Sequence, residues 1–460
     1  LSLANCRGQC YDGASNMLGS KSGVAKRIQE LQPKAHATHC HGHSLSLSMK
    51  DTTKNCKVIS NTMDTAKEIV TLIKFSPKRE NLLGEIQKNL EEGELATHGI
   101  IKLCPTRWTV RASCFQRILD NYSALLQEWM VCLDEKLQAD IRGRIIGCQA
   151  QMKTYDFFFG LNLGERLFSH TDNLSKTLQS TKMCAASGQR LANLTKEVLQ
   201  KIRSDESFIL FYEAILIKSK NIPSISEPTL PRKRRAPARF EIGTGMPSYP
   251  TTSQDYYRQI YFECIDFMIN AIEQRFNQPS FSVYEQMESF LLKVLNDQDY
   301  STELQFLEDN YSGDLDIGAL KSQLEIFELL LKDADCVCFY DMLVKIRELP
   351  EPEKKMISHI ITICKLIQVN PATSASAERS FSAARRLKTW LRSTMSQERL
   401  NNLTVINEHK ERTDGLCLVD IANEFCERNE NRKRNFGRFV ESDCYQHSNI
   451  CAICQKEALG

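Results

Sequence analysis

Hydrophobic and polar positions follow two different rhythms along the chain. In the first part, short apolar runs end at turn residues, which predicts a strand from Leu1 to Tyr11 that ends at Asp12. A helix over residues 23–31, a short strand near 35–40 and a helix from Ser44 are expected to follow. This order of elements is typical of an α/β fold.

From about residue 55, apolar residues recur every three or four positions, as in amphipathic helices. Such helices are predicted over residues 59–73, 115–129, 191–217, 256–276, 283–295 and 320–331. Six prolines interrupt the rhythm at residues 219–255, which predicts a surface loop. Its basic run Arg232-Lys233-Arg234-Arg235 has three open readings: a phosphate contact, a nuclear-import signal or a merely solvated loop.

A last strong helix is predicted after Pro371, which suits a first helical turn. Its apolar face carries Ala377, Phe381, Ala384, Leu387 and Leu391, and its polar face carries Glu378, Ser382 and Arg385. A second apolar segment, with Leu400, Leu403, Val405 and Ile406, is expected to pack nearby.

The composition, with 42% hydrophobic and 25% charged among 460 residues, indicates a soluble globular protein with two or more cores. A net charge of +2 gives no global electrostatic case for nucleic acid, so that case rests on local basic clusters at 232–239, 385–392 and 427–438. The chain begins with Leu and has no signal peptide or long apolar run, so we expect an intracellular fragment without a membrane span. Most of the 18 cysteines are expected to be reduced core thiols.

Two Cys/His groups raise the question of zinc. The first is His36, His39, Cys40, His41 and His43, with Cys6 and Cys10 upstream, and the second is Cys444, His447, Cys451 and Cys454. Neither has the spacing of ordinary zinc modules, so a packed Cys40 thiol, a hydrogen-bonded His43 and an unstructured tail are the favoured readings, with zinc as the alternative. No phosphate-binding loop, nucleophile elbow or His-Glu-x-x-His helix supports a hydrolase or a nucleotide-binding protein.

Several blocks in order, "RGQCYDGASNM", "CHGHSLSLS", "CPTRWTVRASCFQRI" and "NPATSASAERSFSAARRLKTWLRSTMSQERLNNL", resemble the hAT transposases. Within that family they are similar to the transposable element-derived part of the zinc finger MYM-type group. The resemblance implies an RNase H-like core interrupted by a large all-helical insertion, predominantly helical overall. It divides the chain into a partial core at 1–55, the insertion at 56–350 with the loop at 219–255, a C-terminal core helix and dimerisation region at 351–412, and a tail at 413–460.

The resemblance also implies a metal site in which three carboxylates hold two Mg²⁺ ions for DNA cleavage and joining. Asp12 and Glu378 match two of these ligands. The family's first Asp is expected upstream of Leu1, so a catalytically incomplete site is expected in this chain. If both carboxylates bind one metal, they must lie close together in the fold.

Further roles follow from the same resemblance. Trp108 matches an aromatic residue that stacks on a displaced base, beside a phosphate-binding Arg107; the alternative is that Trp108 anchors a helix start. Cys40 and His43 match an element that is structural or handles the DNA end. The dimer contact is expected at Phe381, Leu387, Leu391, Leu400, Leu403, Val405 and Ile406, and the basic run 232–235 is a further candidate for DNA contact.

The sequence therefore predicts a nuclear, DNA-associated homodimer or higher oligomer derived from an hAT transposase. Two alternatives stay open: a fragment of an active, Mg²⁺-dependent transposase, and an interaction scaffold that does not bind DNA.

Overall fold

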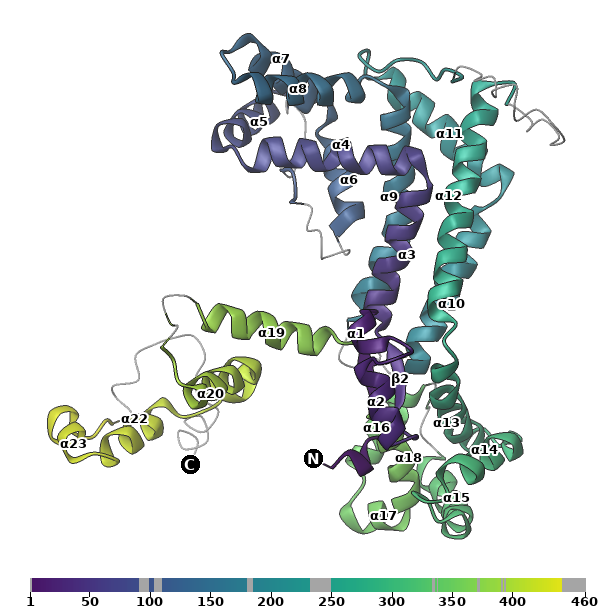
Figure 1. Cartoon of the computed structure of the whole chain (residues 1–460), viewed down its shortest axis with the longest axis vertical. Helices are drawn as coiled ribbons and strands as arrows, with labels where there is room; N and C mark the ends of the chain where they lie inside the picture. The colour runs from purple at the N-terminus through teal and green to yellow at the C-terminus, as the bar shows by residue number, and fades with distance from the viewer. Residues whose placement is uncertain are drawn as a thin grey trace. The chain divides into compact units, whose positions relative to one another are not determined.

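The computed structural model of the chain describes residues 2–90, 99–102, 110–179, 185–231, 250–332, 336, 338–369, 373–389, 392 and 394–440. The fold is predominantly helical, as the sequence predicts (Figure 1). The internal contacts divide the chain into two compact units, Leu1–Ser374 and Ala375–Gly460, which are described separately. Among the described helices, none is long and apolar enough to cross a membrane.

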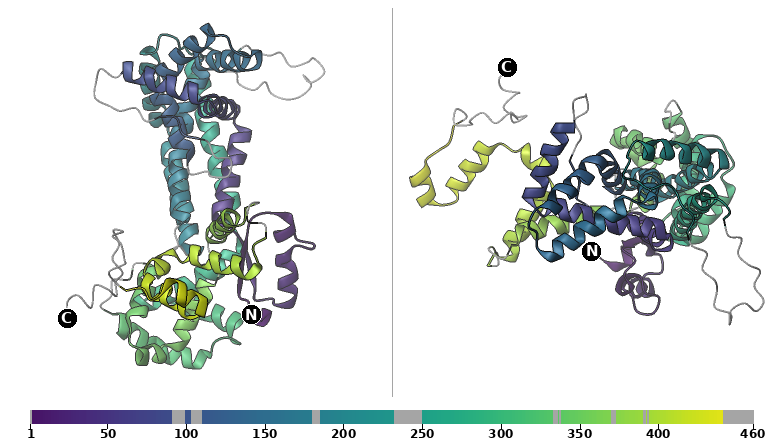
Figure 2. Two further views of the ribbon diagram at one scale, coloured as in Figure 1. Left: turned by 90° about the vertical axis from the view of Figure 1, so that its left-hand side faces the viewer. Right: turned by 90° about the horizontal axis from the view of Figure 1, so that it is seen from above.

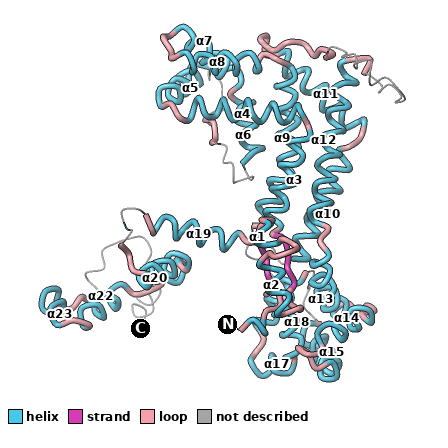
Figure 3. The backbone as a smooth tube through the Cα atoms, in the orientation of Figure 1, coloured by secondary structure: helices cyan, strands magenta, loops and turns pink. Residues whose placement is uncertain are grey.

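The first unit begins with two parallel strands, drawn in magenta in Figure 3. Strand β1 (Gly8–Tyr11) pairs with β2 (His36–His39) from Gly8 opposite His36 to Tyr11 opposite His39, and helices α1 (Ser15–Leu18) and α2 (Val24–Leu31) connect them. The predicted strand from Leu1 was too long, because a 3₁₀ turn, η1 (Leu3–Asn5), occupies its first part. The Ser2 hydroxyl accepts a hydrogen bond from the Ala4 N–H and so favours the turn.

Three polar side chains of this small βαβ piece fix its position. The buried Gln9 amide donates to the carbonyl oxygens of Ala25 (3.2 Å) and Ala35 (3.0 Å), which joins β1 to α2 and to the start of β2. Arg7 and Lys34 both pair with Asp314, at 2.5 Å and 3.0 Å, and so connect the strands to a segment that lies 307 and 280 residues later in the chain.

A first hydrophobic core extends from Leu45 to Phe276. It is formed by α3 (His41–Asn55), α4 (Lys57–Lys74), α5 (Pro77–Leu90), α6 (Arg111–Asp120), α7 (Tyr122–Asp134), α8 (Ala139–Met152), α9 (Tyr155–Leu178), α10 (Ala185–Ile202), α11 (Asp205–Lys220) and α12 (Ser253–Phe276). The long helices α3, α9, α10 and α12 run beside one another (Figures 1 and 2). A disulfide joins Cys56 to Cys264, and the free thiols include the buried Cys40, Cys114, Cys132, Cys148 and Cys364.

A second hydrophobic core extends from Phe281 to Ile367. Its helices are α13 (Pro279–Leu295), α14 (Ser301–Tyr311), α15 (Ile317–Leu331), α16 (Phe339–Glu348), α17 (Glu351–Met356) and α18 (Ser358–Gln368). Helix α13 also packs against β2. The span 56–350, expected as one helical insertion, thus contributes to two separate cores.

The second unit consists of short helices: α19 (Ala375–Leu387), α20 (Gln397–Glu408), α21 (Lys410–Asp414), α22 (Leu418–Glu427) and α23 (Glu430–Phe436). Helix α19 packs on α20, and α22 packs on α23. Of its described residues, only Ala383 and Cys426 are buried. Helices α22 and α23 lie where the sequence predicted a tail.

Candidate functional site

The carboxyl ends of β1 and β2 meet at one edge of the sheet, the place where parallel sheets commonly carry ligand sites. Asp12 follows β1 directly and is exposed. Its carboxylate accepts a hydrogen bond from the Ala14 N–H at 3.2 Å, which stabilises the turn into α1. Cys40 follows β2, and its N–H donates to the Tyr11 carbonyl at 2.8 Å, so the two strand ends are fixed together.

His39 lies next to Asp12, although no separate role was predicted for it. A Cβ atom on Gly13 would lie only 2.9 Å from Cε1 and Nε2 of His39, so the absence of a side chain there makes room for the ring. Burial, together with the nearby His43 and Arg275, lowers the pKa of His39 to about 4, although Asp12 opposes the shift. The imidazole is therefore neutral at pH 7, and within the described part of the chain its buried Nε2 atom has no hydrogen-bond partner.

Cys40 and His43 share the start of α3 but have different surroundings. Cys40 is buried, whereas His43 is half-buried and its ring centroid lies 5.4 Å from that of His39. A hydrogen bond from the Cys10 thiol lowers the pKa of Cys40 to about 6 against the effect of burial. The Ser374 N–H also donates to the Cys40 Sγ atom, at 3.2 Å. Cys40 therefore holds Ser374, the last residue of the first unit.

The other histidines of the group point to different places. His41 is fully buried and stacks between Phe276 and Phe281, with ring centroids at 5.2 Å and 4.2 Å. His36 packs edge-on against Tyr284. No three His, Cys, Asp or Glu side chains among the described residues are arranged to hold a metal ion, so the zinc alternative gains no support here. The Cys/His group at 444–454 lies outside the described residues.

Gln278, at the junction of α12 and α13, holds the outer edge of β2. Its side-chain amide accepts from the His39 N–H at 2.9 Å and donates to the His39 carbonyl at 3.4 Å. Sequence reasoning missed this residue, because it lies 239 positions from its partner and no local pattern marks it.

Glu378 is exposed on α19, in the second unit. Since Asp12 belongs to the first unit, their predicted approach stays a prediction. The described strand ends of the first unit supply one carboxylate, whereas Mg²⁺ prefers several oxygen ligands. These residues by themselves do not supply the ligands of a magnesium site.

The Arg107–Trp108 pair lies outside the described residues, as does the basic run 232–235. Helix α6 begins just after the pair. The buried Asp172 of α9 accepts a hydrogen bond from the Ala112 N–H at 3.1 Å and so caps the first turn of α6. Burial raises the pKa of Asp172 to about 6, although this hydrogen bond opposes the shift. Asp172, which sequence reasoning also missed, thus fixes the helix that follows the Arg-Trp pair.

The residues expected at the dimer contact fall into two groups. Phe381, Val405 and Ile406 are exposed by 74%, 58% and 50%. Leu387, Leu400 and Leu403 are half-buried on α19 and α20, which pack together. Leu391 lies outside the described residues.

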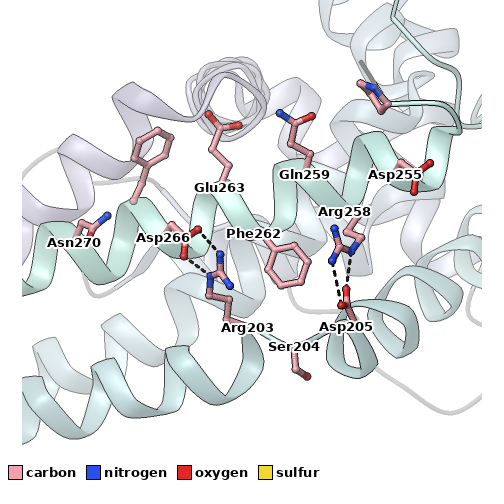
Figure 4. Close-up of a pocket in the computed structure, with 12 residues that line it drawn as sticks. Arg203, Ser204, Asp205, Asp255, Arg258, Gln259, Phe262, Glu263, Asp266 and Asn270 are labelled. Atoms are coloured by element: carbon pink, nitrogen blue, oxygen red, sulfur yellow. Dashed lines mark hydrogen bonds and ion pairs between the residues drawn. The ribbon is translucent and has the colours of Figure 1, made fainter. Parts of the chain in front are cut away.

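A cavity of about 790 Å³ in the first unit lies elsewhere, between α12 and the turn that joins α10 to α11 (Figure 4). Arg203 pairs with Asp266, and Arg258 pairs with Asp205, one ion pair on each side of Phe262. Both guanidinium groups also lie over the Phe262 ring, at 5.0 Å and 4.8 Å. Since each arginine already has a carboxylate partner, the described residues that line this cavity offer no free cation for a phosphate, and the strand ends remain the better candidate site.

Comparison with known proteins adds a family and three relatives. Residues 360–411, from within α18 to the start of α21, match the hAT family C-terminal dimerisation region. The chain is 23% identical over 436 residues to the 52 kDa repressor of the inhibitor of the protein kinase from Mus musculus, which covers 88% of this chain and 54% of the relative. For the Homo sapiens protein of that name, the identity is again 23%, over 88% of this chain and 53% of the relative.

A shorter stretch of 96 residues is 23% identical to zinc finger BED domain-containing protein 4 of Homo sapiens, covering 21% of this chain and 8% of the relative. The chain spans about half the length of the first two relatives.

Proposed function

Because the chain is an hAT-derived protein with the family's C-terminal dimerisation region, we propose that it acts in the nucleus as a DNA-associated protein that works as a dimer. The dimerisation match is the observation that carries this proposal. An RNase H-like core around β1 and β2 belongs to the proposal too, and the MYM-type grouping stays a prediction. One relative is named a repressor and another a zinc finger BED domain-containing protein, names that suit a protein acting through binding.

We assign the dimer contact to the exposed residues Phe381, Val405 and Ile406. Three large apolar side chains that are at least half exposed are unfavourable in water, and a second copy would cover them. Leu400 and Leu403, also predicted at the dimer contact, are half-buried on α20, and we propose that they pack between α20 and α19 instead. Of the matched region, α18 is unavailable for the contact, since most of its apolar residues are buried in the second core.

Two sets of substitutions separate these roles. Phe381→Glu with Val405→Glu places charge in the proposed contact and should give a folded monomer by light scattering. Leu400→Glu with Leu403→Glu should instead disrupt the packing of α19 on α20 and reduce helicity in circular dichroism. An unchanged dimer mass for the first variant, with intact helicity, would place the interface elsewhere.

DNA association is proposed to depend on Arg107, Trp108 and the basic run 232–235. Alanine at positions 232–235 removes four cations, so affinity for any DNA should fall. The slope of log affinity against log salt concentration should decrease by the equivalent of up to about four phosphate contacts. Trp108→Ala should weaken only the binding of an end with an unpaired base, since stacking contributes about 1–3 kcal/mol per base. Fluorescence anisotropy with blunt and unpaired ends measures both effects. If neither variant changes binding, the scaffold alternative gains support.

The active-transposase alternative depends on whether Asp12 and Glu378 share a site. Incubating the chain with Mg²⁺ and a DNA end distinguishes the two functions. Strand cleavage that is abolished by Asp12→Asn and by Glu378→Gln indicates the transposase, whereas binding without cleavage indicates the DNA-associated dimer.

A further inference from the structure

Helices α22 and α23 form a hairpin beyond the matched dimerisation region, which ends at residue 411. The Asn423 side chain donates to the Phe439 carbonyl at 3.1 Å and accepts from the Phe439 N–H at 2.8 Å, which holds the segment after α23 against α22. The Arg432 guanidinium lies 4.0 Å above the Phe425 ring, and Cys426 is buried. The hairpin is therefore a defined element with its own internal contacts.

Among the described residues, one face of this hairpin is apolar and exposed. Leu418, Ile421 and Phe425 are spaced three and four residues apart, so they lie on one side of α22. They are exposed by 73%, 45% and 50%, and Phe436 of α23 is exposed by 60%. Asp420, Glu424 and Glu427 lie on the opposite side of α22, which gives the helix one apolar and one acidic face.

We propose that this apolar face is an outer part of the dimer interface and is covered by a second copy of the chain. The inference rests on the proposed dimer and extends it past the family's matched region. The main argument is continuity: α22 begins seven residues after the match ends and belongs to the same compact unit as α19 and α20.

Interface size and charge favour the same occupant. A stable interface takes about 800 Å² from each partner, whereas four half-exposed apolar side chains offer on the order of 100 Å² each. The face is thus too small to hold a partner alone, but it suits the extension of a larger contact. Helix α22 carries three acidic and no basic residues, and α23 carries three basic residues and one acidic residue. Because a two-fold interface uses the same surface on both copies, such a surface can be complementary to itself.

A photo-crosslinker identifies the occupant. In the full chain, Leu418→p-benzoylphenylalanine should give a covalent dimer of twice the chain mass on illumination. The matched control is Leu329→p-benzoylphenylalanine, since Leu329 is similarly exposed (71%) on α15 of the first unit, and it should stay monomeric in mass. A crosslink from position 418 to its own chain only, or no crosslink in a dimeric protein, overturns the inference.

The affinity of the dimer gives the second readout. Leu418→Glu with Ile421→Glu should raise the dimer dissociation constant roughly tenfold or more in sedimentation experiments, with unchanged helicity. Leu329→Glu should leave the constant unchanged. An unchanged constant for the double variant overturns the inference while leaving the dimer in place. A parent chain that is monomeric at all concentrations contradicts the proposed function itself.

Discussion

Glu128 shows how a single residue links this fold to pH. It lies on α7 with no exposed surface, and neither carboxylate oxygen has a hydrogen-bond partner in the part of the chain that the structure describes. Burial raises its pKa to about 8, although the Arg79 guanidinium opposes the shift. The carboxyl is therefore protonated in the folded chain at neutral pH, whereas in the unfolded chain it ionises above about pH 4.5.

This difference predicts that Glu128 destabilises the fold progressively as pH rises from about 5 to 8. The unfolded chain releases a proton that the folded chain keeps, so unfolding is favoured at higher pH, by up to a few kcal/mol. Glu128→Gln cannot ionise and should lose this dependence. Urea unfolding at pH 5 and pH 8 measures it: the variant should gain stability relative to the parent as pH rises. Parallel pH profiles would show that Glu128 is charged in the folded chain.

At the scale of elements, helix α9 depends on two glycines for its close packing. A Cβ on Gly160 would overlap Thr62 of α4, and one on Gly164 would overlap the Phe115 ring of α6. By contrast, a Cβ on Gly143 or Gly147 of α8 would meet no atom within 4 Å. In α9, glycine thus allows close contact with neighbouring helices. In α8, where no neighbour needs the space, glycine only lowers the stability of the helix.

These positions give a matched pair of substitutions. Gly164→Ala should destabilise the chain by about 1–3 kcal/mol, because the added methyl group must displace a fully buried ring. Gly147→Ala should be neutral or stabilise by up to about 1 kcal/mol through its better helix propensity. Chemical unfolding followed by circular dichroism compares them. Equal effects of the two changes would contradict the close contact between α6 and α9.

At the scale of the whole molecule, the two units differ in how they are stabilised. Both hydrophobic cores, from Leu45 to Phe276 and from Phe281 to Ile367, lie within Leu1–Ser374. The second unit buries little of its own apolar surface among the described residues. Folding of the first unit therefore should not need the second, whereas the second unit needs a partner surface.

A chain truncated after Ser374 tests this difference. Residues 1–374 should keep their helical circular dichroism and cooperative unfolding, because both cores are retained, and should be monomeric by light scattering. A dimer of this fragment would place the main contact in the first unit. Loss of cooperative unfolding would mean that the second unit completes one of the cores.

The sequence by itself determined much of the local structure. Apolar residues that recur every three or four positions predicted the helices over residues 59–73, 256–276 and 320–331. This pattern involves only residues that are close in the sequence, so it can be recognised without the tertiary structure. The relationship to hAT proteins could also be recognised from the sequence, because the family's motifs are short and follow one another in a fixed order along the chain. The ranges 115–129 and 191–217 were each predicted as one helix, but each contains two helices in the structure. The second helix of each pair begins after a polar N-cap residue, Asn121 or Ser204.

Only the tertiary structure decided which of these residues meet. The histidines of residues 36–43 look alike in sequence, yet His41 is buried between two phenylalanines from a later segment and His39 lies beside Asp12. Gln278 completes the edge of β2 from 239 residues away, and Cys40 reaches Ser374. The physical reason is that burial and hydrogen-bond partners depend on packing between distant segments, which periodicity does not encode. The same holds for the uncovered face of α22, since an apolar stripe predicts burial but does not name the surface that covers it.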